Sequence, residues 1–138
     1  MNCYLDSSVV LRKLFGEPNS IREWKKIRTG FSSRLLKIEC LRTIDRLRLT
    51  ADLTNEETAK RLEGFRVMLA LIGILPLTQR IQERTEQSFS TPLGTLDGLH
   101  LATALLWREI HGDDFVFATH DEQLALAARS HGFVVIGG

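Results

Sequence analysis

The sequence of 138 residues has few cysteines, few prolines and no long hydrophobic run. Its two cysteines, Cys3 and Cys40, each lie among apolar residues, so we expect buried free thiols rather than a disulfide framework or a cysteine metal site. The longest apolar run, residues 67–77, spans about 11 residues, whereas a membrane-spanning helix needs about 20. No basic-then-apolar leader opens the chain. We therefore expect a cytoplasmic protein that makes no use of a membrane.

The composition that is present is that of an ordinary globular protein, with 43% hydrophobic and 25% charged residues. We expect residues 1–138 to form a single domain, because this length is typical of one. The net charge is +1, but residues 1–50 carry 11 Lys and Arg against 5 Asp and Glu, and residues 51–138 carry 7 against 12. Such an uneven charge indicates either ordinary solvated faces or a basic flank that attracts phosphates.

Hydrophobic periodicity and turn residues predict short strands that alternate with helices. The expected strands cover residues 2–6, 31–34, 74–78, 114–119 and 133–138. The expected helices cover residues 7–15, 20–28, 35–49, 53–72, 79–89, 95–112 and 121–132. This alternation favours a parallel sheet with helices on both faces, whose strands end at one common edge.

Several helix starts carry capping residues. Ser7 or Ser8 is expected to cap the helix at residues 7–15. Thr54 and Glu57 form a capping box, and Thr119 and Glu122 have the spacing of a second one.

Four acidic residues stand at or near the predicted ends of these elements. Asp6 ends the first strand, and Asp121 follows the strand at residues 114–119. Asp97 lies at the start of a helix, and Glu39 lies one turn into another. Helix capping would explain Asp97 and Asp121, and an ion pair with Arg42 or Arg46 would explain Glu39.

The alternative is that the four carboxylates meet at the edge of the sheet. Like charges that close together must take up protons or a cation, and hard divalent ions prefer oxygen ligands. An ion held by carboxylates can activate water and neutralise charge on a phosphoryl group. The pattern therefore suggests phosphodiester hydrolysis.

Four stretches of the sequence support this hypothesis through a family resemblance. They are "YLDSSVV", "IECLR", "TLDGLHLATA" and "THDEQLALAARSHG". In order and approximate spacing they resemble the four acidic motifs of PIN-domain ribonucleases, and most of all those of the VapC-type toxins of bacterial toxin–antitoxin pairs. The resemblance covers nearly the whole chain, and the third motif is its most specific part. It implies a three-layer α/β/α sandwich with a mostly parallel sheet of four or five strands, and Mg²⁺- or Mn²⁺-dependent cleavage of RNA.

The resemblance also implies roles for single residues. Asp6 and Asp97 would bind the ion, Glu39 would bind it or accept a proton from the attacking water, and Asp121 would orient water on the ion or hold a second one. Ser8 and Thr119 match the hydroxyl positions of the first and last motifs.

Members of this family are usually inhibited by a small antitoxin protein and commonly form homodimers. The chain departs from the family pattern at two places. Ser7 stands where Thr is common, and Gly98 replaces the usual Ala after Asp97.

Other interpretations stay open at this point. His100 is interpreted as a packing residue, with positioning of Asp97 as the alternative. The chain could be a catalytically silent PIN-like module that binds RNA or a protein. A receiver-like signalling domain shares the size and layering but requires a late Lys, and no Lys follows Lys60.

Overall fold

The computed structural model describes residues 1–138, which form a five-stranded parallel sheet with the strand order β3-β2-β1-β4-β5. The strands are β1 (Asn2–Leu5), β2 (Thr29–Ser33), β3 (Ile72–Leu75), β4 (Val116–Ala118) and β5 (Val135–Ile136). Six α-helices and one 3₁₀ helix connect them. They are α1 (Ser7–Leu14), η1 (Arg22–Lys26), α2 (Leu35–Leu49), α3 (Asn55–Leu69), α4 (Gln79–Thr85), α5 (Thr95–His111) and α6 (Glu122–Ser130). None of these helices has both the length and the apolar character that a membrane span requires.

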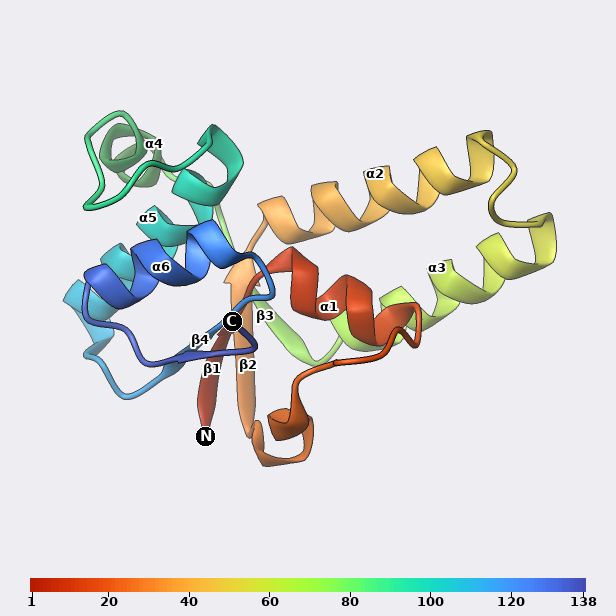
Figure 1. The fold of residues 1–138 in the computed structure, drawn as a ribbon, viewed down its shortest axis with the longest axis horizontal. Coiled ribbons are helices and arrows are strands. Elements are labelled where there is room, and N and C mark those ends of the chain that lie inside the picture. The colour runs from red at the N-terminus through yellow and green to blue at the C-terminus, as the bar shows by residue number, and fades with distance from the viewer.

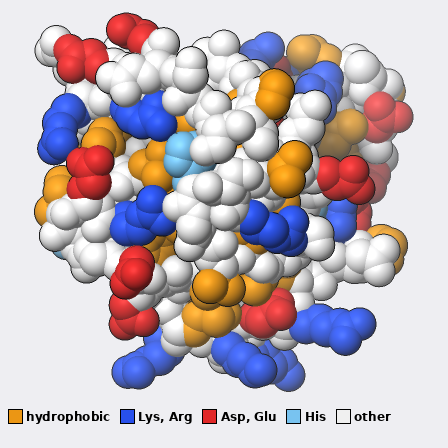
Figure 2. All heavy atoms as spheres, turned by 60° about the vertical axis from the view of Figure 1, so that its left-hand side comes forward, with side chains coloured by type: hydrophobic (Ala, Val, Ile, Leu, Met, Phe, Trp, Pro, Cys, Tyr) orange, Lys and Arg blue, Asp and Glu red, His pale blue; other side chains and the backbone are white.

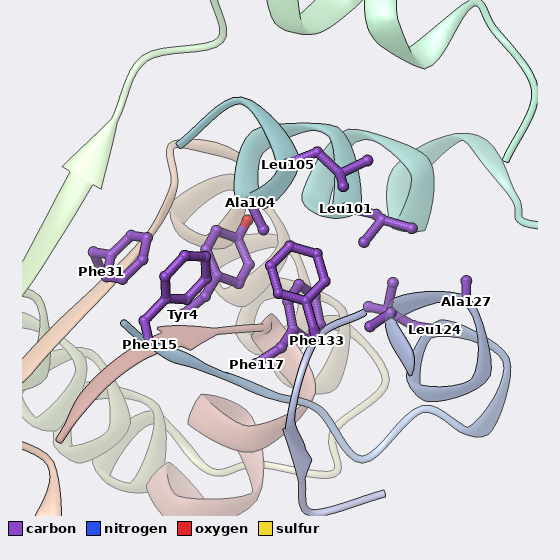
Figure 3. Close-up of a cluster of buried hydrophobic side chains, with 11 residues drawn as sticks. Tyr4, Phe31, Leu101, Ala104, Leu105, Phe115, Phe117, Leu124, Ala127 and Phe133 are labelled. Atoms are coloured by element: carbon purple, nitrogen blue, oxygen red, sulfur yellow. The ribbon is translucent and has the colours of Figure 1, made fainter. Parts of the chain in front are cut away.

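Helices cover both faces of the sheet, which confirms the predicted three-layer α/β/α sandwich (Figure 1). Successive residues of β1 point to opposite faces. Tyr4 packs with Phe117 and with α5 and α6, in the aromatic cluster drawn in Figure 3. Cys3 and Leu5 pack on the other side against α1, α2 and α3.

The strand order makes the end of β1 the place where ligands bind in open α/β sheets. From β1 the chain crosses to β2 on one side and later returns to β4 on the other. Strand order therefore reverses at β1, and a crevice forms outside the carboxyl ends of the strands at such a point. Helices α1, α2 and α6 begin close together there (Figure 1).

The excess of basic residues in the first 50 positions and of acidic residues in the rest does not divide the surface in Figure 2 into a basic and an acidic part. On the face in Figure 2, basic, acidic and hydrophobic side chains are interspersed without a large patch of one kind.

Several predicted elements differ from the structure. The helix expected at residues 79–89 ends at Thr85, and the strand expected at residues 74–78 covers Ile72–Leu75. The helix expected at residues 20–28 is only the 3₁₀ helix η1, because its apolar residues Ile21, Trp24 and Ile27 recur every three positions, which suits a 3₁₀ turn. The helix expected at residues 53–72 ends at Leu69, and Gly73 lies inside β3 because β2 pairs there. The capping box of Thr54 and Glu57 is confirmed.

Candidate active site

Asp6 lies directly after β1 and is held from two sides. Its backbone N–H donates to the carbonyl of Ala118 in β4, 3.0 Å away. Its Oδ2 accepts hydrogen bonds from Ser8 Oγ at 2.6 Å and from Thr119 Oγ1 at 2.9 Å. The residue is only 4% exposed.

Asp6 itself is the N-cap of α1, so the expectation that Ser7 or Ser8 caps this helix is wrong. The short strand leaves Asp6 extended, which is the backbone conformation an N-cap requires.

Glu39 reaches the same place from the second turn of α2. Its Oε1 accepts a hydrogen bond from Ser7 Oγ at 2.6 Å and lies 2.6 Å from His100 Nε2. No ion pair joins it to Arg42 or Arg46, and Arg42 instead lies 3.6 Å from Asp45. Glu39 therefore faces the site rather than a neighbour on its own helix.

His100 of α5 joins these two acids and is fully buried. Its Nε2 lies 3.4 Å from Asp6 Oδ1, and its Nδ1 lies 2.7 Å from the hydroxyl of Tyr4. Burial lowers the pKa of His100, but the hydrogen bond to Glu39 and the charges of Asp6, Glu39 and Asp97 raise it, and the net shift is upward.

The interpretation of His100 from sequence missed these contacts. It bonds to Glu39 and Tyr4, which are 61 and 96 residues away in the chain. The one signal in the sequence is a histidine in the middle of an otherwise apolar helix face.

Asp97 lies in the first turn of α5 and is not its N-cap, because that position belongs to Gly94. Burial raises the pKa of Asp97 from its usual 3.8 to about 6, and the charges of Asp121, Asp6 and Glu39 add to this shift. The four acids therefore share one electrostatic environment. Repulsion of this kind is relieved by a proton or by a cation.

Asp121 is the N-cap of α6, and its Oδ1 accepts a hydrogen bond from the backbone N–H of Leu124 at 2.8 Å. Helix capping therefore accounts for Oδ1 of Asp121 and leaves its Oδ2 without a hydrogen bond. The second capping box is wrong, because Thr119 Oγ1 donates to Asp6 and accepts from the backbone N–H of Asp121 instead of capping with Glu122. Thr119 in this way links the first and last acidic motifs.

The donor set fits a hard divalent cation. No hydrogen bond occupies Glu39 Oε2, Asp121 Oδ2 or either carboxylate oxygen of Asp97, and Asp6 Oδ1 has only the 3.4 Å contact with His100 Nε2. No three Asp, Glu, His or Cys side chains are close enough to ligate one ion together. Mg²⁺ does not need such a cage, because it keeps several waters and binds through one or two carboxylates.

Comparison with known proteins identifies the family of the chain. The sequence model of the PIN domain matches residues 3–130. The chain belongs to the PIN-domain family. This assignment excludes the receiver-like alternative.

Two curated relatives and one solved structure resemble this PIN-domain chain along most of their length. Ribonuclease VapC47 of Mycobacterium tuberculosis (strain CDC 1551 / Oshkosh) is 28% identical over 138 residues, with 95% of this chain and 93% of that protein covered. Ribonuclease VapC46 of Mycobacterium tuberculosis (strain ATCC 25618 / H37Rv) is 29% identical, with 96% and 95% covered. A chain in a toxin–antitoxin complex from Klebsiella pneumoniae has the same fold, with a TM-score of 0.62, 17% identity and 91% of each chain covered.

Proposed function

We propose that this PIN-domain protein is a divalent-metal-dependent ribonuclease that hydrolyses RNA phosphodiester bonds and acts as the toxin of a toxin–antitoxin pair. The observation that carries the proposal is that Asp6 and Glu39, from two separate motifs, contact the same imidazole of His100, while the charges of Asp6, Glu39 and Asp121 raise the pKa of Asp97. The distant relatives named as ribonucleases support it.

Asp6 and Asp97 would hold Mg²⁺ or Mn²⁺, with Glu39 and Asp121 beside them. The ion would supply an activated water and positive charge against the phosphoryl oxygens. The chain itself does the positioning. The hydroxyls of Ser8 and Thr119 fix Asp6.

Ser7 and His100 hold one oxygen of Glu39 and leave Oε2 free to accept a proton from the attacking water. Asp97 must lose its own proton before it can bind the ion, so this acid sets the lower pH limit of activity.

The proposed partners are an RNA substrate, a small antitoxin and a second copy of the chain. The antitoxin is supported by the fold shared with a chain of the Klebsiella pneumoniae toxin–antitoxin complex.

The direct test is an RNA cleavage assay. The pure protein is incubated with single-stranded and structured RNA in Mg²⁺, in Mn²⁺ and in EDTA. We expect cutting that EDTA abolishes and that Asp6→Asn and Asp97→Asn each reduce at least 100-fold. Asp113→Asn is the matched control, because this exposed acid follows α5 at its far end from Asp97. RNA binding without any cutting would contradict the proposal and favour the silent PIN-like module.

A further inference from the structure

Arg42 and Arg46 lie on the same face of α2 as Glu39, three and seven residues farther along the helix. Residues with this spacing stand above one another on a helix surface. Glu39 points to the candidate active site, because it contacts Ser7 and His100 there. The two arginines therefore continue a line that begins at the site, and Arg46 stands about 10 Å from Glu39 along the helix axis.

The positive charges of these two arginines are not neutralised within the protein. Arg46 is exposed, and its guanidinium makes neither an ion pair nor a hydrogen bond with the protein. Arg42 has a side chain that is 76% exposed and lies 3.6 Å from Asp45, which bonds more closely to Arg48 at 2.9 Å. Because Arg42 and Arg46 are one helical turn apart, their like charges repel. An anion bound along this face would relieve that repulsion.

The centre of the candidate active site lacks positive charge of its own. The charges that shift the pKa of Asp97 are those of Asp121, Asp6, His100 and Glu39, and none of them belongs to a Lys or Arg. A strand of phosphates that approaches these carboxylates meets negative charge until a cation is bound. The attraction for the strand has to come from side chains beside the site.

Other basic residues near the site are less suited to this task. Arg12 of α1 lies 3.9 Å from Glu17 and donates to the carbonyl of Asn19 at 3.4 Å. Arg34 and Lys37 precede Glu39 by five and two residues, and residues at these spacings lie on different sides of a helix.

We infer that Arg42 and Arg46 bind neighbouring phosphates of the RNA strand beside the cleaved bond, so that the strand runs from the site along α2. The inference rests on the proposed function. An Arg guanidinium suits this role because its planar fork donates two parallel hydrogen bonds to one phosphate. Phosphate contacts fix the position of a strand and carry no sequence information directly. Of the two interpretations of the uneven charge, this is the basic flank that attracts phosphates.

The salt dependence of RNA binding tests the inference without relying on cleavage. Asp6→Asn protein in EDTA, in which cutting is removed twice over, is titrated against short labelled single-stranded RNAs in a series of KCl concentrations, with fluorescence anisotropy as the readout. Each phosphate contact to a single strand contributes about 0.7 to the slope of log K against log salt. Arg42→Gln and Arg46→Gln should each reduce this slope by about 0.7 and weaken binding about 3- to 10-fold at low salt, equally for RNAs of different sequence.

Arg48→Gln is the matched control. It removes the same charge from the same helix, but Arg48 follows Arg46 by two residues and so lies on another side of α2. This variant should leave the slope unchanged. Arg46→Lys keeps the charge and should keep the slope of the parent protein. All three arginines are exposed, so urea denaturation should show that each variant folds as the parent does.

An unchanged slope in either Arg42→Gln or Arg46→Gln, an equal change in Arg48→Gln, or no binding of RNA would overturn the inference. RNA cleavage by the wild type together with unchanged slopes would overturn this inference alone. Reduced slopes without any cleavage by the wild type would overturn the proposed function and leave the RNA path along α2 in place.

Discussion

Replacing Tyr4 with Phe tests the buried link behind the candidate active site. The hydroxyl of Tyr4 lies 2.7 Å from Nδ1 of His100, and both side chains are fully buried. The variant keeps the ring, which stacks on Phe117 with centroids 5.0 Å apart. The change therefore removes one hydrogen bond and leaves the packing in place.

The expected loss of stability follows from the His100 nitrogen that Tyr4→Phe leaves without a partner. When His100 is neutral, its Nε2 donates to Glu39 and its Nδ1 accepts from Tyr4, and when it is protonated both nitrogens donate. In either state the variant leaves Nδ1 without a partner in a site that water does not reach. An unsatisfied buried group costs about 1–3 kcal/mol, so the free energy of unfolding should fall by that amount.

Urea denaturation of four proteins measures this effect. They are the wild type, Tyr4→Phe, His100→Leu and the double variant, and the coupling between the two sites should be at least about 1 kcal/mol. Thr58→Val is the control. The buried hydroxyl of Thr58 donates to the carbonyl of Thr54, and this carbonyl also accepts a hydrogen bond from the backbone N–H of Thr58. This variant should therefore lower the free energy of unfolding less than Tyr4→Phe does. A loss below about 0.5 kcal/mol for Tyr4→Phe, or strict additivity with His100→Leu, would refute the buried link.

Three further predictions concern pH, the hydroxyl that joins two motifs, and the thiols. Because the folded pKa of Asp97 is raised to about 6, the stability tied to its protonated form is present below about pH 4 and is lost as pH rises through 6. Without divalent ions, Asp97→Asn should thus exceed the wild type in stability by on the order of 1–2 kcal/mol at pH 7, and urea titrations at pH 4 should show no difference. Thr119→Val removes a donor to Asp6 and an acceptor for the N–H of Asp121, so its free energy of unfolding should fall by about 1–3 kcal/mol. A fall no larger than that of Ser130→Ala, which changes an exposed serine at the end of α6, would contradict this. Burial raises the pKa of Cys3 and of Cys40 to about 12, so neither thiol should react with a thiol reagent at pH 8 until urea unfolds the chain, and fast labelling of the native protein would show the core to be open.

Local signals in the sequence were sufficient for most of the fold. The long apolar stripe of α5 and the capping box at Thr54 are local features, and both predictions are confirmed. Alternation of strands and helices indicated the parallel sheet, which brings Asp6 to its carboxyl edge. The α-helix predicted at residues 20–28 is a 3₁₀ helix instead. The prediction failed because three apolar residues in so short a segment fit a repeat of three positions nearly as well as a repeat of 3.6.

The interior of the site depends on contacts that no local pattern contains. Thr119 bonds to Asp6 across 113 residues of sequence, and His100 bonds to Glu39 across 61. A hydroxyl before an acid and a histidine in an apolar helix each have a simple local explanation. Only the packed fold distinguishes that explanation from a bond to a distant carboxylate.

The measurement that tests the central claim most directly is thermal unfolding in EDTA and in Mg²⁺ at pH 7, for the wild type and for Asp97→Asn. If Asp6 and Asp97 hold a cation beside Glu39 and Asp121, Mg²⁺ should raise the stability of the wild type by about 2.7 kcal/mol at 100 times its Kd. Asp97→Asn should be the more stable protein in EDTA and should gain little from the ion. A wild type that does not respond to Mg²⁺ or Mn²⁺, or a variant that responds equally, would contradict the account.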